Sequence, residues 1–189
     1  VQLIGTVTTP SGERGSGLVT SANQYATGSA GNVIINTQQL LLQDGARVNV
    51  SSQGTGNAGN LTVNARSIYL NNNATLNADT TSTESNQEQA TINISSKDLI
   101  LRRSNITTTG TGSQVIGGNI NIDTAVLAAV ENSHISADSA KFRGGQVKIN
   151  AQSIFLSPDS SITAKGVNQQ LNGTVQIISP EIDPSRGLV

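Results

Sequence analysis

The 189-residue chain contains no cysteine, methionine or tryptophan and only two tyrosines and two phenylalanines. Without cysteine it has neither a disulfide framework nor a thiolate metal site. A core that lacks large aromatic side chains has to be filled by valine, isoleucine, leucine and alanine, which favours stacked β-strands with like residues lying over one another. The composition therefore indicates an all-β protein with a long, thin core.

Charged residues are also scarce, because they make up 12% of the chain and the formal net charge is −1. Nucleic acids and anionic membrane surfaces are bound through clusters of basic side chains, which this chain does not offer. No apolar run approaches the roughly 20 residues that span a bilayer. We therefore expect no nucleic-acid partner and no membrane insertion.

A repeat of about 28 residues is the strongest signal in the sequence. Units with matching patterns begin at Gly31, Gly59, Ala90, Gly118, Gly145 and Gly173. Successive starts are therefore 28, 31, 28, 27 and 28 residues apart. Such a period is typical of a solenoid, in which each unit packs only on its neighbours. Glycine opens most units, and we predict that it occupies a turn with a positive φ angle there.

Apolar and polar residues alternate along three short segments of each unit, which predicts three short strands per unit. Such a unit cannot bury its own apolar face, so the units must pair in parallel, strand upon strand, as the rungs of a β-helix about 4.8 Å apart. Parallel crossovers favour the right-handed form of this helix. The predicted inward columns are Val33, Leu61, Ile92, Ile120, Val147, Val175; Ile35, Val63, Ile94, Ile122, Ile149, Ile177; Leu40, Ile68, Leu99, Leu127, Ile154, Ile182; Leu42, Leu70, Leu101, Ala129, Leu156; and Val48, Leu76, Ile106, Ile135, Ile162.

The chain is predicted to be a single β-helix segment over residues 1–189, with five full rungs in residues 31–172. Residues 1–30 read as a partial first rung, and residues 173–189 as a last partial rung and tail. Both end rungs should leave unpaired strand edges, through which copies or flanking segments can stack.

Two polar insertions, at 6–15 and 80–89, break the even rung length and are predicted to be surface loops.

Three runs resemble one family of exoproteins. GTGNAGNLTVNA (54–65), LLLQDGARVNVSS (40–52) and PEIDPSRGLV (180–189) are similar to the large filamentous haemagglutinin-like proteins of the two-partner secretion type, particularly those of cyanobacteria. The resemblance covers essentially the whole chain. It implies an internal or C-terminal segment of a secreted β-helical protein, exported through a dedicated outer-membrane partner and displayed at the cell surface. It implies no catalytic residues and no cofactor.

A polar column ends the first strand of successive rungs. Asparagine tolerates turn conformations, and stacked amides can hydrogen-bond to the rungs above and below, so we interpret this column as a structural Asn ladder. Its members are Asn36, Asn64, Ser95, Asp123 and Asn150.

The best candidates for acid–base chemistry are Asp79 and Asp138, which hold the same place two rungs apart. Two rung spacings give roughly 9–10 Å, near the upper end of the separation in inverting glycosidases, so a carbohydrate-active β-helix enzyme is the alternative function. However, Thr109 and Lys165 complete the column, and no aromatic residue that could stack on a sugar lies in the nearby strands. We therefore predict no catalytic site.

Metal binding also lacks its usual residues. Asp98, Asp123 and Glu131 fall in separate turns, and the glycine-rich nonapeptide of calcium-binding β-rolls is missing, so we predict no calcium site. His134 is the only histidine, and we expect it to be solvated, without a second ligand or base in its column.

Ice binding by a flat β-helix face is a minor alternative. It requires regular rows of threonine, and charges interrupt the outward columns of the third strand. These columns are Asn49, Asn77, Thr107, Ser136, Thr163, and Ser51, Asp79, Thr109, Asp138, Lys165.

One outward column of the second strand is apolar, and we call it the apolar stripe. Soluble monomers usually avoid such rows. We hypothesise that this face packs against another copy, a flanking segment, or a surface protein or glycan, although β-propensity alone could also place these residues there. The stripe comprises Leu41, Tyr69, Ile100, Ala128 and Phe155. Together these features predict a non-catalytic, extracellular structural or adhesin segment that offers a rigid, repetitive polar surface for binding.

Overall fold

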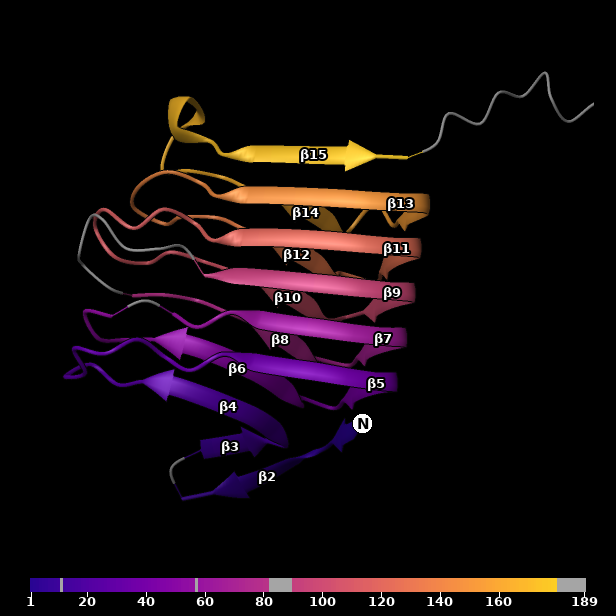
Figure 1. Ribbon diagram of the computed structural model, residues 1–189, viewed down its shortest axis with the longest axis horizontal. Helices are drawn as coiled ribbons and strands as arrows, with labels where there is room; N and C mark the ends of the chain where they lie inside the picture. The colour runs from indigo at the N-terminus through magenta and orange to yellow at the C-terminus, as the bar shows by residue number, and fades with distance from the viewer. Residues whose placement is uncertain (11, 57, 82–89, 180–189) are drawn as a thin grey trace, which may run out of the picture.

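The computed structural model describes residues 1–10, 12–56, 58–81 and 90–179. The chain forms a parallel β-solenoid of about five turns, which confirms the predicted all-β fold (Figure 1). One sheet has the order β1 (Gln2–Ile4), β5 (Val33–Gln43), β7 (Leu61–Asn71), β9 (Thr91–Arg102), β11 (Asn119–Val130), β13 (Gln146–Leu156), β15 (Thr174–Ile178). The other has the order β14 (Ser161–Thr163), β12 (His134–Ser136), β10 (Asn105–Thr107), β8 (Thr75–Asn77), β6 (Arg47–Ser52), β4 (Gly17–Ala22).

The strand register confirms the predicted columns. Val33 pairs with Leu61, and Leu61 pairs with Ile92 in the next rung. The same register continues through β11, β13 and β15, and it aligns the short strands β6 to β14 in the same way. Ile182, expected at the end of one column, lies outside the described residues.

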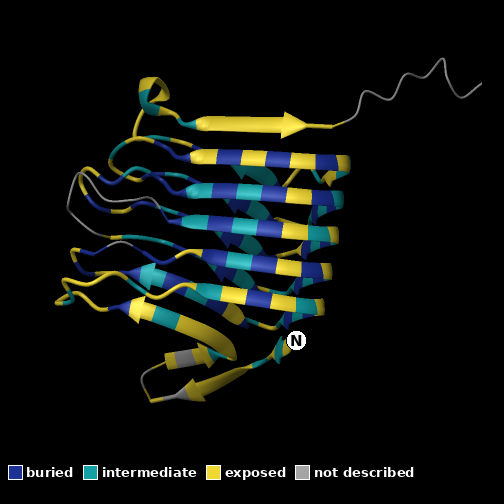
Figure 2. Ribbon diagram, in the orientation of Figure 1, coloured by how far each residue is buried: buried dark blue, intermediate teal, exposed yellow. Residues whose placement is uncertain are grey.

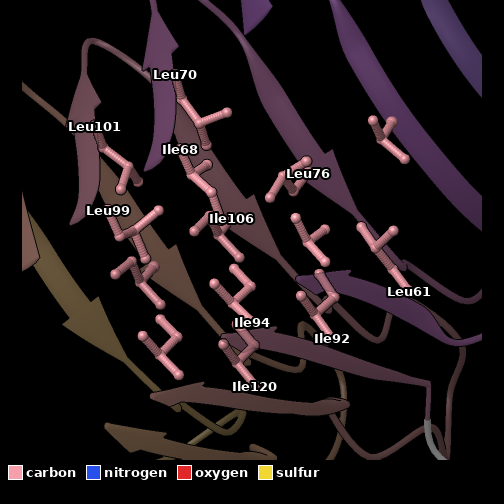
Figure 3. Close-up of a cluster of buried hydrophobic side chains, with 14 of the residues drawn as sticks. Leu61, Ile68, Leu70, Leu76, Ile92, Ile94, Leu99, Leu101, Ile106 and Ile120 are labelled. Carbon is pink, nitrogen blue, oxygen red and sulfur yellow. The ribbon is translucent and has the colours of Figure 1, made fainter. Parts of the chain in front are cut away.

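The core is a continuous row of stacked aliphatic side chains, which Figure 2 shows as buried bands repeating from strand to strand. In the central rungs, Leu99 and Leu101 are fully buried beside Ile68 and Leu70 of β7, and Ile106 is fully buried beside Leu76 of β8 (Figure 3). Like residues therefore fill the interior without aromatic side chains, as the composition predicted.

The first two predicted strands of each rung form one long strand. Near the middle of this strand the alternation of inward and outward residues shifts by one position. In β7, Leu61, Val63 and Ala65 are buried, whereas Arg66 and Ser67 both lie outward before burial resumes. Two consecutive outward residues turn the strand around a corner. Odd-numbered residues of β7 point inward before this corner, and even-numbered residues point inward after it. The prediction of three separate strands was therefore wrong for the first two. The inward column at this corner had not been predicted, and it comprises Thr37, Ala65, Ser96, Thr124 and Ala151.

Glycine at the rung starts serves close backbone approach, so the predicted positive φ angle was wrong at these positions. A Cβ on Gly59 would lie 2.1 Å from the carbonyl oxygen of Gly31, and one on Gly145 would lie 1.9 Å from that of Gly118. None of these four glycines is among the residues with positive φ. At Gly59, Gly118 and Gly145 the backbone of the previous rung therefore leaves no room for a side chain.

Positive φ angles occur instead at the corner between the long and the short strands. Asparagine adopts this conformation more readily than most residues. The non-glycine residues with positive φ in the described chain are Asp44, Asn72, Asn73, Arg103, Glu131 and Asn132.

The two ends of the solenoid differ. At the N-terminal end, the insertion at 6–15 forms an antiparallel hairpin of β2 (Thr6–Thr9) and β3 (Gly12–Gly15), so it is more regular than the predicted loop. At the other end, a 3-10 helix at Gln169–Leu171 precedes β15, which has a neighbour on one side only in the sheet order. The inward residues Val175 and Ile177 are 41% and 50% exposed there. Most of the second insertion, residues 82–89, lies outside the described residues.

Candidate functional site

The apolar stripe lies on the outer surface of the second half of the long strands. The register pairs Leu41 with Tyr69, Tyr69 with Ile100, Ile100 with Ala128, and Ala128 with Phe155. The first four side chains are half-buried by their neighbours, and Phe155 is 62% exposed. The residues predicted from the repeat are therefore brought together in one continuous row.

The stripe is wider than the sequence indicated. Val126 and Val130 flank Ala128 on β11 and also lie outward and half-buried. A shallow groove beside the stripe is lined in part by Leu41, Tyr69 and Ile100. This surface can bind an apolar partner through dispersion and the hydrophobic effect, and the phenol of Tyr69 is the one polar side-chain group in the row.

Charged groups border the stripe at β9. The carboxylate of Asp98 accepts a hydrogen bond of 3.2 Å from the hydroxyl of Ser67. On the other side, Arg102 donates to Glu131 at 2.7 Å, and Arg103 donates to the same carboxylate at 2.5 Å. These exposed guanidinium groups lower the pKa of Glu131, chiefly through the hydrogen bond from Arg102.

The predicted Asn ladder consists of two linked pairs and a gap. The amide of Asn64 donates to Oδ1 of Asn36 at 2.8 Å, and the amide of Asn150 donates to Oδ1 of Asp123 at 3.4 Å. Between these pairs, Ser95 is in register, but its hydroxyl is not bonded to another described residue.

A second amide pair had not been predicted. The amide of Asn121 donates to Oδ1 of Asn93 at 2.9 Å, in the outward column next to the Asn ladder. Both residues sit two positions before a member of the ladder, so extending the column alignment by one outward position would have found them.

Both candidate catalytic carboxylates accept at least one hydrogen bond from the next rung. Oδ1 of Asp79 accepts from the backbone N–H of Thr109 at 2.6 Å, and Oδ2 accepts from the amide of Asn77 at 2.6 Å. Asp138 accepts in the same manner from the backbone N–H of Lys165 and, at 3.0 Å, from the hydroxyl of Thr163.

Burial raises the pKa of Asp79, although the hydrogen bonds from Thr109 and Asn77 act against this shift. Each carboxylate joins its rung to the next one, and this is a structural arrangement. The same bonds engage side chains of the outward columns considered for ice binding. Asn77 donates to Asp79, and Thr163 donates to Asp138.

The histidine is held more firmly than expected. His134 is half-buried, and its Nδ1 lies 2.8 Å from the hydroxyl of Ser161 while Nε2 lies 3.1 Å from Oδ1 of Asn132. The ring is therefore partly exposed and is held by two polar neighbours, one of them its column mate Ser161. The exposed carboxylate of Asp159 lies in the same corner, where the hydroxyl of Ser157 lowers its pKa.

Within the part of the chain that the structure describes, no three histidine, aspartate or glutamate side chains lie close enough together to hold a metal ion. The three acidic residues considered for calcium binding each accept a hydrogen bond from another side chain. Ser67 donates to Asp98, Arg102 donates to Glu131, and Asn150 donates to Asp123.

No helix among the described residues is both long and apolar enough to cross a membrane. Comparisons with protein-family models, curated proteins and solved structures found no match to this chain.

Proposed function

We propose that this chain is a non-catalytic structural and adhesive segment of a large, secreted surface protein. In this proposal the solenoid acts as a rigid rod, and its outer surface binds partners without converting them. The resemblance to filamentous haemagglutinin-like exoproteins supports an extracellular, cell-surface location and export of the full-length protein through an outer-membrane partner.

The observation that carries the proposal is the apolar stripe. Its side chains project from a continuous sheet and stack at strand spacing, about 4.8 Å apart. A rigid sheet orders the side chains before binding, so association loses little conformational entropy. Apolar surface of this kind marks an interaction site.

The alternative of a carbohydrate-active enzyme is less well supported. A glycosidase needs one carboxylic acid that can donate a proton and a second carboxylate free to act on water or on the sugar. Each carboxylate instead accepts two hydrogen bonds: Asp79 accepts one from the next rung and one from Asn77 of its own rung, and Asp138 accepts both from the next rung.

The decisive experiment places charges on the stripe. Tyr69→Glu combined with Phe155→Glu should weaken binding to host-cell or bacterial surfaces and any self-association by about tenfold or more, because each charge would have to be desolvated at the interface. Light scattering and a surface-binding assay measure the two effects. Gln53→Glu combined with Gln114→Glu adds the same charge at exposed positions outside the stripe and should leave binding unchanged. Equal binding by wild type and the stripe variant would contradict the proposal.

A further inference from the structure

A polar groove runs along the solenoid on the first half of the long strands. It crosses β7, β9, β11 and β13, which lie side by side in this sheet (Figure 1). Its lining includes Asn64, Asn93, Ser95, Asn121, Asp123 and Lys148. The groove is thus built from the two outward columns that flank the inward residues Ile94 and Ile122.

The groove is open because the Asn ladder is interrupted. The two linked pairs stop at Asn64 on one side and at Asp123 on the other. The short side chain of Ser95 lies between these pairs and bonds to neither Asn64 nor Asp123. Beside this gap, the pair Asn93 and Asn121 forms the opposite wall.

Hydrogen-bonding groups along the groove retain unused capacity. The bond between Asn121 and Asn93 uses one N–H of Asn121 and the oxygen of Asn93, so the amide nitrogen of Asn93 and the oxygen of Asn121 remain available. The hydroxyl of Ser95 and the ammonium group of Lys148 also bond to no other described residue. Both donors and acceptors therefore face the same narrow surface.

We infer that this groove binds an extended, neutral polysaccharide lying parallel to the solenoid axis, an inference that rests on the proposed function. Rungs repeat about every 4.8 Å, close to the length of one sugar unit in an extended chain, so successive hydroxyl groups meet equivalent rows of amides. Four rungs span about 14 Å, which accommodates about three sugar units.

The charge of the groove selects a neutral ligand. Asp123 and Lys148 are the charged residues of its lining, and their formal charges cancel. A nucleic acid or an acidic glycan would require an excess of basic groups. Amide groups that can donate and accept match sugar hydroxyls, which also do both.

The test uses native gels containing hydroxyethylcellulose, mannan, dextran or alginate, run with the full chain. We expect at least one of the three neutral polymers to retard the wild-type protein. Ser95→Asn fills the gap with a residue that already occupies the same column in other rungs, so the variant should fold and its retardation should fall at least fivefold. Asn121→Ala should weaken retardation similarly, because it removes the available amide oxygen of Asn121 and the bond that positions Asn93.

Ser136→Asn is the matched control, because it makes the same substitution on the short-strand sheet, in a column that contains Asn49 and Asn77. It should migrate like wild type in every gel. The inference is overturned if no neutral polymer retards the wild type, if only alginate does, or if Ser95→Asn and Asn121→Ala bind as wild type does.

Measuring reducing ends in the same mixtures separates the two proposals. New reducing ends would overturn the non-catalytic function. Loss of neutral-polymer binding with intact stripe-dependent adhesion would overturn the groove alone.

Discussion

The backbone N–H of Thr109 donates a hydrogen bond of 2.6 Å to Oδ1 of Asp79, one rung earlier in the solenoid. Oδ2 of the same carboxylate accepts from the amide of Asn77. Desolvation nevertheless outweighs these bonds, so the pKa of Asp79 lies above its ordinary value of 3.8. A carboxylate that links two rungs therefore also makes the stability of the solenoid depend on pH.

The raised pKa gives this dependence a definite sign. The folded chain holds the proton of Asp79 more tightly than the unfolded chain does, so the stabilisation from its protonation is fully present below 3.8 and is lost as the pH rises through the raised pKa. Asp79→Asn removes this titration. The unfolding free energy of the wild type, relative to that of the variant, should therefore increase as the pH falls from about 7 to about 4. Urea titrations at the two pH values measure the difference.

Asp159→Asn is a control with the opposite sign. The hydroxyl of Ser157 lowers the pKa of Asp159, so its stabilisation is present above 3.8 and is lost as the pH falls through the lowered pKa. This carboxylate is exposed, and its effect should be small. The expectation for Asp79 fails if wild type and Asp79→Asn show the same pH dependence.

The rung-start glycines that approach the previous rung closely, Gly59, Gly118 and Gly145, should not tolerate a side chain. Gly145→Ala would place a Cβ 1.9 Å from the carbonyl oxygen of Gly118 and force two rungs apart, so we expect a loss of about 1–3 kcal/mol in the free energy of unfolding. Gly28→Ala is the matched control, because nothing lies within 4 Å of its Cβ position. It should be neutral or stabilising by up to about 1 kcal/mol, since alanine restricts the unfolded chain. Thermal and urea unfolding compare the two, and equal losses would contradict the close-approach explanation.

The central rungs should be more sensitive to core truncation than the end rung. Leu99 is fully buried on β9, whereas Leu156 at the end of β13 is 46% exposed. Leu99→Ala should cost about 2–5 kcal/mol through lost burial and the cavity left behind, and Leu156→Ala should cost less than about half as much. Urea unfolding measures both values. Similar losses would show that the end rung is covered in solution by other parts of the chain or by another copy.

The periodicity of the sequence was sufficient to predict the parallel solenoid and its register. An inward residue such as Leu99 has an aliphatic counterpart at the same place in every rung, and only stacked parallel strands bring such residues together. The apolar stripe followed from the same alignment, because a residue between two inward ones must lie outward.

Details that depend on the path of the backbone were not predictable from this pattern. The corner at Arg66 and Ser67 shifts the alternation within one continuous strand, which resembles a break between two strands. Glycine is compatible both with positive φ and with close approach, so Gly145 alone could not indicate which one applies. The polar groove depends on Ser95 being shorter than its neighbours in the column, and its depth became apparent only from the packed side chains.

A buried row of small residues at the corner before the short strands gives a final prediction about hydrogen bonding. Ser133 is fully buried, and its hydroxyl accepts from the backbone N–H of Ser104 at 3.2 Å and donates to the carbonyl of Val130 at 2.7 Å. Ser133→Ala should lower the unfolding free energy by about 1–3 kcal/mol, because it leaves the buried N–H of Ser104 without its acceptor. Alanine fits the space, since Ala74 occupies an equivalent buried corner.

Ser136→Ala tests whether that loss comes from the hydrogen bond. Ser136 lies three residues further along on β12 and is half-buried, and its hydroxyl bonds to no other described residue. Its replacement should change the unfolding free energy by less than about 0.5 kcal/mol. Urea unfolding of both variants, together with amide hydrogen exchange at Ser104, gives the comparison. If Ser133→Ala were as stable as Ser136→Ala and exchange at Ser104 did not accelerate, the corner hydroxyl would contribute nothing to holding the rungs together.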